Sequence, residues 1–289
     1  MIKHLVLAGG GPTMIQMLSI IQHLEKNAFI DMKNIETIYG TSAGAIIGTL
    51  IALKFDWETI NDYIIKRPWQ DVFPIKIDNI FSSYLKKGIF DSTTVEKCFK
   101  PLFDAKDIPM DINLEDFYKL SNIELHMFSF EINDYKIVDV SYLTHPKLSL
   151  LTAIHMTSAL PLLLTPVCID DKCYIDGGIS TNYPLNYCIK SNKKPDEILG
   201  IKSKYGVNKS IINNDSNLLD FLMNFLYKAV FSISTDNIQD KIKNEINCDA
   251  EYLNINVLKN ALYEIETRKQ LFNNGTEIAT NFLIQITEQ

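Results

Sequence analysis

The chain has 289 residues, of which 46% are hydrophobic and 22% are charged, and its formal net charge at pH 7 is −7. This length and hydrophobic content exclude a disordered chain and fit one large α/β domain or two small ones. The acidic balance argues against a nucleic-acid partner, because phosphate backbones are bound by basic patches.

The first residues predict a buried strand. Apolar residues dominate positions 2–8, and the run leads directly into glycines, which argues against a signal peptide. No uninterrupted apolar run in the sequence reaches the roughly 18 residues that a transmembrane helix needs. We therefore expect a soluble, cytoplasmic protein.

A glycine-rich turn follows this strand and precedes a helix. Gly9, Gly10 and Gly11 come before Pro12, which suits the first turn of a helix because its missing N–H would have had no partner there. Bare backbone amides in such a turn can bind a nucleotide pyrophosphate or a tetrahedral oxyanion. Met14 stands where the dinucleotide fingerprint has its third glycine, so the oxyanion is the favoured ligand.

The next strand ends in Gly40-Thr41-Ser42-Ala43-Gly44, which matches the G-x-S-x-G pattern of a nucleophile elbow. In such an elbow a strand reverses into a helix within about three residues, so the neighbours of the serine must be small. Alternating apolar residues before Gly40 and a helical run from Ala43 supply this context. The pattern therefore predicts Ser42 as a nucleophile, although five such residues alone could also form an ordinary turn.

The middle of the chain predicts further helices and an irregular segment. Helices are expected over residues 57–66 and 93–103, and a capping box of Thr93 and Glu96 opens the second. Residues 68–90 between them are irregular and rich in aromatic side chains. This segment fits either a lid that contacts substrate or a cover over the core.

Two strands and a helix are predicted next. The strands cover residues 122–130 and 135–140 and are joined by an Asn-Asp turn pair at positions 133–134. The helix covers residues 149–159. His155 lies on this helix among apolar neighbours, so we expect it to be packed in the core.

Asp176 ends a predicted hairpin over residues 167–175 and precedes two glycines. A serine nucleophile needs a base, which in α/β-hydrolases is a histidine that follows the acid. All the histidines precede Asp176, so that order cannot be completed: His4, His23, His126, His145 and His155. The carboxylate of Asp176 can be the base directly, although an Asp before Gly also fits an ordinary turn. A Ser-His-Asp esterase of different chain order, with His126, His145 or His155, stays open.

The cysteines are odd in number and form no C-x-x-C pair: Cys98, Cys168, Cys173, Cys188 and Cys248. This fits reduced thiols better than a disulfide framework or a zinc site. Cys168 and Cys173 flank the turn of the hairpin and could face each other across it, but two small apolar fillers are favoured.

The C-terminal third predicts a buried strand over residues 198–203 and an apolar amphipathic helix over residues 217–233. Such a helix either covers the sheet or dips into a lipid interface. We favour the sheet, because Asp220 and Asn224 interrupt the apolar run and Lys228 is its only basic residue.

These motifs together resemble the patatin-like phospholipases. Gly9-Gly10-Gly11 is similar to the oxyanion loop of that family, residues 40–44 to its nucleophile elbow, and residues 176–178 to its catalytic aspartate motif. Residues 157–161 and the hairpin resemble the block that leads into this aspartate. The similarity spans residues 1 to about 200, and residues 270–282, with Gly275 inside, faintly resemble the closing helix of the family.

The resemblance implies a dyad in which Ser42 is the nucleophile and Asp176 the general base, with Gly9, Gly10 and Gly11 as the oxyanion hole. The residues that support these motifs are Gly40, Ala43, Gly44, Gly177 and Gly178. The implied substrate is a phospholipid or related lipid ester, with no metal and no cofactor. A transient contact with a membrane surface is left open.

The expected fold is one three-layer α/β/α domain over residues 1–289 with a mainly parallel sheet. Its motifs lie in residues 1–200, and further strands and helices follow in residues 200–289. The glycine loop departs from the family, because Thr13 and Met14 stand where a basic residue and a further glycine are usual. Backbone donors survive that change, but headgroup contacts are left open. A catalytically inactive lipid-binding module is therefore a second alternative.

Overall fold

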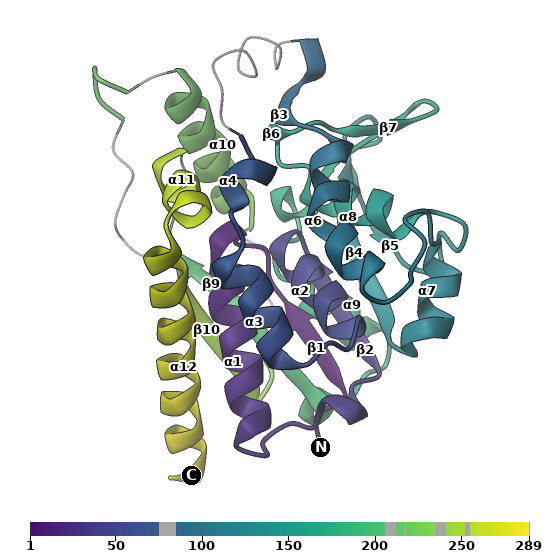
Figure 1. Cartoon of the computed structure of the whole chain (residues 1–289), viewed down its shortest axis with the longest axis vertical. Coiled ribbons are helices and arrows are strands. Elements are labelled where there is room, and N and C mark those ends of the chain that lie inside the picture. The colour runs from purple at the N-terminus through teal and green to yellow at the C-terminus, as the bar shows by residue number, and fades with distance from the viewer. Residues whose placement is uncertain (75–84, 206–211, 217, 235–240, 252–254, 289) are drawn as a thin grey trace.

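The computed structural model describes residues 1–74, 85–205, 212–216, 218–234, 241–251 and 255–288 (Figure 1). The strands are β1 (His4–Leu7), β2 (Thr37–Thr41), β3 (Gly88–Phe90), β4 (Glu124–Glu131), β5 (Lys136–Val140), β6 (Leu162–Leu164), β7 (Val167–Ile169), β8 (Lys172–Asp176), β9 (Ile198–Tyr205) and β10 (Asn244–Ala250). The helices are α1 (Met14–Lys26), α2 (Ala43–Ala52), α3 (Trp57–Lys66), α4 (Trp69–Val72), α6 (Ser92–Asp104), α7 (Leu114–Ser121), α8 (Leu150–Ser158), α9 (Leu185–Lys190), α10 (Leu218–Ser234), α11 (Ile255–Tyr263) and α12 (Ile265–Thr287).

Most strands form one mixed sheet in the order β10–β9–β1–β2–β4–β8–β7, and β5 also pairs with β4. The strands from β10 to β4 run parallel, whereas β5, β7 and β8 are antiparallel to their neighbours. β3 and β6 form a separate two-stranded sheet. This arrangement confirms the predicted α/β fold with a mainly parallel sheet.

Strand β8 continues the line of β2 along one edge of β4. Thr41 at the end of β2 pairs with Phe128, and Asp176 at the end of β8 pairs with the next residue, Ser129. β5 pairs with both Phe128 and Ser129, so it occupies the other edge of β4, because one edge of a strand holds a single neighbour at each residue. The ends of β2 and β8 therefore meet end to end beside β4.

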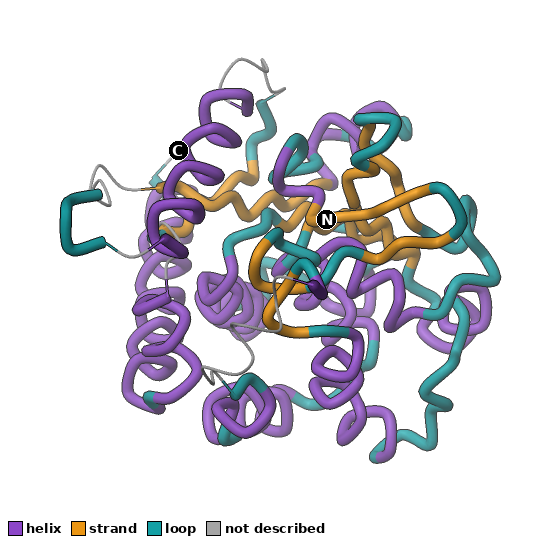
Figure 2. Tube along the Cα trace, turned by 90° about the horizontal axis from the view of Figure 1, so that it is seen from above, coloured by secondary structure: helices purple, strands orange, loops and turns teal. Residues whose placement is uncertain are grey.

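Helices cover both faces of the sheet (Figure 2). The consecutive residues Ile38 and Tyr39 of β2 point to opposite faces, as side chains on a strand do. α2 packs on the face of Ile38, where a Cβ on Gly48 would lie 2.9 Å from the Ile38 side chain. On the face of Tyr39, α9 brings the ring of Tyr187 to 4.6 Å from that of Phe128. The structure thus has the predicted three layers.

The C-terminal helix α12 packs along α1 (Figure 1). A Cβ on Gly275 would overlap the carbonyl oxygen of Gln16, so a glycine is needed for this close approach. Next to it, Ser19 Oγ and Thr276 Oγ1 lie 2.8 Å apart. The segment that resembles a closing helix therefore lies within α12 and joins the C-terminal end of the chain to the first helix.

The predicted capping box of α6 is wrong. The helix begins at Ser92, and its N-cap is Asp91, whose carboxylate accepts the N–H of Thr93 at 3.1 Å. An acidic side chain two residues earlier thus bonds the free amide at the start of the helix, and Thr93 and Glu96 do not form the reciprocal pair.

The aromatic segment over residues 68–90 is described only at its two ends, in α4 and β3. Residues 75–84, which include Phe81 and Tyr84, lie outside the described residues. Trp69 and Phe73 pack edge-on against Tyr63 and Phe90. Both also line the cavity described below, so this part of the segment belongs to the wall of the cavity.

The expectation that the helix over residues 217–233 covers the sheet is wrong. In the described residues of this helix, α10, Met223 is buried against Leu163 of β6. Its other side exposes three apolar residues at helical spacing: Leu218 (72% exposed), Phe221 (49%) and Phe225 (65%). Residue 217 lies outside the described residues. No helix in the described part of the chain is long and apolar enough to cross a membrane.

Candidate active site

Ser42 occupies the sharp turn between β2 and α2. Its backbone has φ 52° and ψ −120°, a conformation with positive φ that costs free energy for any residue except glycine. Two glycines in this turn lie so close to neighbouring backbone atoms that a side chain would not fit. A Cβ on Gly44 would overlap the carbonyl of Leu7, and a Cβ on Gly40 would lie 2.7 Å from the nitrogen of Ala45. The turn therefore requires the small residues that define the elbow pattern.

The hydroxyl of Thr157, near the end of α8, supports this turn. It accepts the backbone N–H of Ser42 at 3.0 Å and donates its own proton to the carbonyl of Phe128 at 2.5 Å. Thr157 is fully buried. One hydroxyl thus links the elbow to β4 and satisfies two buried backbone groups.

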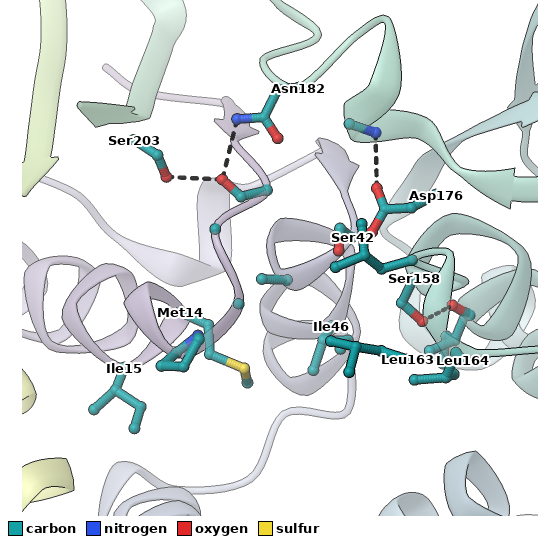
Figure 3. A pocket seen from close by; sticks show the side chains of 18 of the residues that line it. Met14, Ile15, Ser42, Ile46, Ser158, Leu163, Leu164, Asp176, Asn182 and Ser203 are labelled. Carbon is teal, nitrogen blue, oxygen red and sulfur yellow. Dashed lines mark hydrogen bonds between the residues drawn. The ribbon is translucent and has the colours of Figure 1, made fainter. Parts of the chain in front are cut away.

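Asp176, at the end of β8, lies beside the elbow. Its Oδ1 accepts the N–H of Gly178 at 2.7 Å, and its own N–H donates to the carbonyl of Ala159 at 3.0 Å. A Cβ on Gly177 would overlap the carbonyl of Phe128, so this glycine lets the chain pass close to β4. Figure 3 shows the side chains of Ser42 and Asp176 next to each other at the wall of a cavity.

Burial sets the proton affinity of the Asp176 carboxyl group, which is only 4% exposed. Burial raises its pKa from 3.8 to about 6, against hydrogen bonds from the Ser42 side chain and the Gly178 amide that lower it. At neutral pH the carboxylate is therefore mostly ionised, yet it is a stronger base than an exposed aspartate.

The glycine loop is fixed at its first residue and open at the next two. The N–H of Gly9 donates to the carbonyl of Asn182 at 2.9 Å, and the Gly9 carbonyl accepts Asn182 Nδ2 at 3.2 Å and Ser203 Oγ at 2.8 Å. In the described part of the chain no acceptor binds the N–H groups of Gly10 and Gly11. These two amides are available to an oxyanion in the cavity.

A cavity of about 1170 Å³ joins the elbow, Asp176 and the glycine loop. Figure 3 shows Met14, Ile46 and Leu163 around the opening beside Ser42. Further apolar side chains extend this lining: Leu50, Val95, Phe99, Leu102, Ile154 and Leu226. A cavity of this size and lining can hold the hydrocarbon chain of a lipid.

The histidines lie elsewhere, and none is among the described residues that line the cavity. His126 is held between Asp139, at 2.7 Å, and Glu124, at 2.8 Å. Burial opposes its charged form, but hydrogen bonds with these two carboxylates raise its pKa to about 9. Nε2 of His155 lies 2.8 Å from the carbonyl of Thr165, and Nδ1 of His145 contacts Thr144. The geometry therefore gives no support to a Ser-His-Asp triad.

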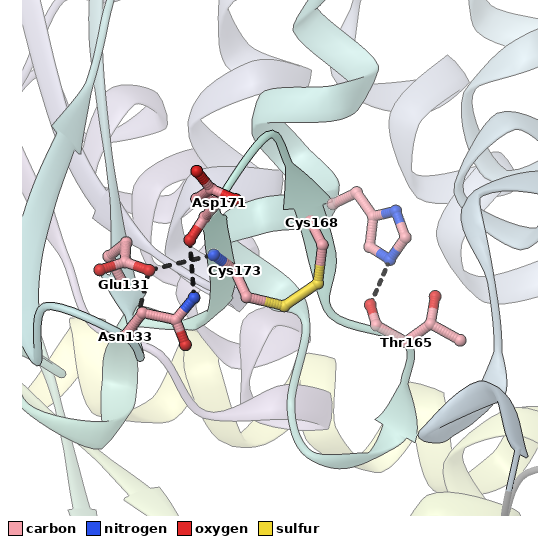
Figure 4. The surroundings of a disulfide bond; sticks show 7 residues. Glu131, Asn133, Thr165, Cys168, Asp171 and Cys173 are labelled. Atoms are coloured by element: carbon pink, nitrogen blue, oxygen red, sulfur yellow. Dashed lines mark hydrogen bonds between the residues drawn. A yellow bond between two sulfur atoms is a disulfide. The ribbon is translucent and has the colours of Figure 1, made fainter.

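The structure joins Cys168 and Cys173 in a disulfide bond across the β7–β8 hairpin (Figure 4). This corrects the expectation of two reduced apolar fillers. The two residues are register partners with Cα atoms 4.1 Å apart, so the hairpin itself brings the sulfurs together. Glu131 fixes the same hairpin by accepting the N–H of Cys173 at 3.0 Å. The other three cysteines are free thiols: Cys98, Cys188 and Cys248.

Sequence reasoning missed Thr157, Asn182 and Ser203 as supports of the site. Thr157 lies in residues 157–161, which resemble a block of the family, but the residue pattern there does not show that the Thr157 hydroxyl contacts Ser42. Asn182 and Ser203 contact Gly9 across 173 and 194 residues of sequence. Contacts over such separations follow from sheet order, which a single sequence does not reveal.

Comparison with known proteins agrees with this geometry. The chain is 25% identical over 218 residues to the probable lipid hydrolase 463L of Invertebrate iridescent virus 6, and the match covers 73% of each protein. It is 26% identical over 187 residues to the uncharacterized protein R571 of Acanthamoeba polyphaga mimivirus, covering 64% of this chain and 60% of that one. The fold is similar to that of VipD from Legionella pneumophila, with a TM-score of 0.58 at 16% identity, over 98% of this chain and 67% of VipD.

The model of the patatin-like phospholipase family matches residues 5–189, well over half of the chain. This range contains the glycine loop, the elbow at Ser42 and the aspartate at position 176. The chain therefore belongs to the patatin-like phospholipase family.

Proposed function

We propose that the protein is a lipid acyl hydrolase of the phospholipase A type, which cleaves carboxylic ester bonds through a Ser42–Asp176 dyad. One observation supports this most directly: Ser42 sits in a strained turn beside a buried carboxylate, at the wall of a large and largely apolar cavity. The family to which the chain belongs supports a lipid as the substrate.

In the proposed acylation step, Asp176 accepts the proton of the Ser42 hydroxyl while the serine oxygen attacks the ester carbonyl carbon. The N–H groups of Gly10 and Gly11 donate to the oxyanion of the tetrahedral intermediate, next to the N-terminus of α2. Asp176 then passes the proton to the leaving alcohol, and the acyl group stays on Ser42. A water molecule, deprotonated by Asp176, releases the fatty acid and restores the serine.

Gly9 has a different part in this proposal from its two neighbours. Its N–H is bonded to Asn182, and its carbonyl is held by Asn182 and Ser203. We therefore assign the oxyanion hole to Gly10 and Gly11 and give Gly9 the role of anchor. A side chain on Gly9 would also crowd the site, because its Cβ would lie 3.3 Å from Ser42 Cβ.

The exposed side of α10 supports a transient contact with a lipid surface. Leu218, Phe221 and Phe225 point to solvent, while Leu226 of the same helix lines the cavity. An apolar helix face of this kind lies in the interfacial region of a bilayer. Binding through it would bring the cavity next to the lipids that are to be hydrolysed.

The test is hydrolysis of a panel of lipids and soluble esters by the wild type and by Ser42→Ala, together with labelling by a fluorophosphonate. We expect the wild type to release fatty acid and to react with the probe at Ser42. An intact fold that neither hydrolyses any ester nor reacts with the probe would instead support the inactive lipid-binding module.

A further inference from the structure

A stripe of apolar side chains on α2 leads away from Ser42 into the cavity. Ala43, Ile46 and Leu50 line the cavity at spacings of three and four residues, so they share one face of the helix. Figure 3 shows Ile46 next to Ser42 on this face. Gly48 lies on the opposite face, where an added Cβ would meet a side chain of β2. The stripe therefore points away from the sheet and begins directly after the proposed nucleophile.

Helix α6 supplies a second stripe of cavity-lining residues at helical spacing: Val95, Cys98, Phe99 and Leu102. The hydroxyl of Tyr63 and the guanidinium of Arg67, near the end of α3, both donate to the carbonyl of Cys98. On another side, α8 packs against both α2 and α6 and adds Ile154 to the lining. The two stripes are therefore walls of one apolar channel, which α3 and α8 flank. We call it the α2–α6 channel.

The α2–α6 channel narrows where its two helices end. Lys106, just beyond α6, donates from Nζ to the carbonyl of Lys54, just beyond α2, at 3.0 Å. The same ammonium lies 4.5 Å from the centre of the Phe55 ring. Leu50 precedes Lys54 by four residues, and Leu102 precedes Lys106 by four, so each leucine lies about one helical turn before this junction. The two leucines therefore face the closed end of the channel.

Leu50 and Leu102 form the floor of the channel. Both are buried, and Leu53 and Phe103, which lie further along, are buried in the core without lining the cavity. From Ser42 to Leu50 the chain rises about 12 Å, at about 1.5 Å per helical residue. An extended hydrocarbon advances about 1.3 Å per carbon, the projection of a carbon–carbon bond of about 1.5 Å. The channel is therefore long enough for about nine or ten carbons.

We propose that the α2–α6 channel holds the acyl chain of the substrate and that Leu50 and Leu102 set the longest chain that fits, so that the enzyme selects medium-length acyl groups. The inference rests on the proposed function and adds the class of acyl group. An acyl chain bonded to Ser42 starts where the stripe on α2 starts, so each further methylene is buried against the two helices. A longer chain must bend out of the channel or displace a leucine from a packed core.

The test measures kcat/KM for a series from p-nitrophenyl butyrate to p-nitrophenyl palmitate, in one non-ionic detergent at one concentration, so that partition into micelles is the same for every variant. For the wild type we expect kcat/KM to rise about fourfold per methylene, the gain from burying a CH₂ group. The maximum should fall at the octanoate or decanoate, with lower values for longer chains.

Substitutions at the floor should move this maximum in both directions. Leu102→Ala opens the end of the channel, so the ratio of kcat/KM for the myristate to that for the octanoate should rise about tenfold or more. Leu50→Ala should have the same effect. Leu102→Phe fills the end, so its maximum should move to shorter esters. Leu102→Val, a smaller truncation, gives the same direction as Leu102→Ala if the larger change prevents folding.

The matched control is Leu114→Ala, because Leu114 of α7 is 3% exposed, as Leu102 is, and does not line the cavity. It should keep the wild-type profile. A wild-type maximum at the palmitate, a maximum that neither floor leucine moves, or an equal shift in Leu114→Ala would overturn the proposal. Leu258→Ala enlarges the cavity at α11 instead. A shift in that variant alone would place the acyl chain along α11 and also overturn it.

The shortest ester separates failure of this inference from failure of the proposed function. If the wild type cleaves p-nitrophenyl butyrate and the profile does not respond to Leu50 or Leu102, only the assignment of the channel is wrong. If the wild type cleaves none of the esters, the proposed function and the channel assignment both fail.

Discussion

Ser42 and Asp176 meet because the strands that precede them lie end to end along one edge of β4. Thr41 at the end of β2 pairs with Phe128, and Asp176 at the end of β8 pairs with the adjacent residue, Ser129. The ends of β2 and β8 therefore lie beside consecutive residues of β4. The end of α8 and the residue after it hold both sides of the junction: the Thr157 hydroxyl accepts the Ser42 N–H, and the Ala159 carbonyl accepts the Asp176 N–H. The sheet itself therefore positions the two groups that we propose as a dyad.

Replacing Thr157 tests how far this support matters. Thr157→Val keeps the shape but leaves the Ser42 N–H and the Phe128 carbonyl without their partner. We expect a loss of about 1–3 kcal/mol in the free energy of unfolding and a clear fall in kcat with little change in KM, because the elbow shifts. Thr157→Ser is the matched control and should stay near wild type in chemical denaturation and in initial rates. Equal activity of the Val and Ser variants would show that the hydroxyl has no part in positioning Ser42.

Gly10→Val tests the proposed oxyanion hole. A Cβ at this position would lie 2.7 Å from Ser203 Oγ and 3.2 Å from Thr13 Cβ, so the loop must move. We expect turnover to fall about a hundredfold or more, as after loss of an oxyanion donor. Thermal stability should fall much less. Turnover near the wild-type value in a folded Gly10→Val variant would remove the loop from the mechanism.

The pKa of about 6 for Asp176 predicts the pH dependence of the reaction. Only the ionised carboxylate can accept the serine proton, so kcat/KM should be constant at neutral pH and fall as the pH drops through about 6. A pH profile measured on a soluble ester checks this. His126→Ala, His145→Ala and His155→Ala should keep the same step, whereas disappearance of the step in one of them would assign it to a histidine.

The pKa of Asp176 also predicts how the free energy of unfolding depends on pH. Because the folded pKa lies above the unfolded value of 3.8, the ionised group destabilises the folded state, fully above pH 6 and not at all well below pH 3.8. The difference corresponds to about 3 kcal/mol at high pH. Asp176→Asn should therefore raise the free energy of unfolding at pH 8 and raise it much less at pH 4. A gain that is the same at both pH values would contradict the assigned pKa.

Vesicle binding tests the exposed face of α10. Phe221→Ser/Phe225→Ser removes two large apolar side chains from that face, so binding of the protein to phospholipid vesicles should weaken about tenfold or more, in line with the apolar area lost. Leu120→Ser/Leu143→Ser is the matched control, because these residues are 57% and 60% exposed but lie outside α10 and do not line the cavity. If both pairs of changes weaken sedimentation with vesicles equally, α10 has no special role.

The sequence was sufficient for the local parts of the site. The elbow at Ser42 and the turn after Asp176 leave room for few residue types. A Cβ added at Gly44 or at Gly177 would overlap the backbone of a neighbouring strand. Every histidine precedes Asp176, so the sequence argued against the Ser-acid-His order of an α/β-hydrolase triad. The expectation of one domain over the whole chain stays a prediction.

The rest depended on contacts between distant segments. The register that places β8 in line with β2 is decided by competition among strands and leaves no mark in either segment alone. The pairing of Cys168 with Cys173 is local to one hairpin, and the sequence offered it as the less favoured of two alternatives. The pKa of Asp176 follows from burial, which is a property of the fold. The helix α10 was misjudged because its composition fits two amphipathic roles, and only its neighbours decide between them.

The most direct test of the dyad compares initial rates on one ester for Ser42→Ala, Asp176→Asn and the double variant. Asp176→Asn preserves shape but cannot accept the serine proton, so we expect each single variant to lose activity to a similar extent. The double variant should lose little more, because groups that act as one unit are strongly non-additive. Substantial activity in Asp176→Asn, together with a histidine variant as inactive as Ser42→Ala, would contradict the dyad and restore the triad.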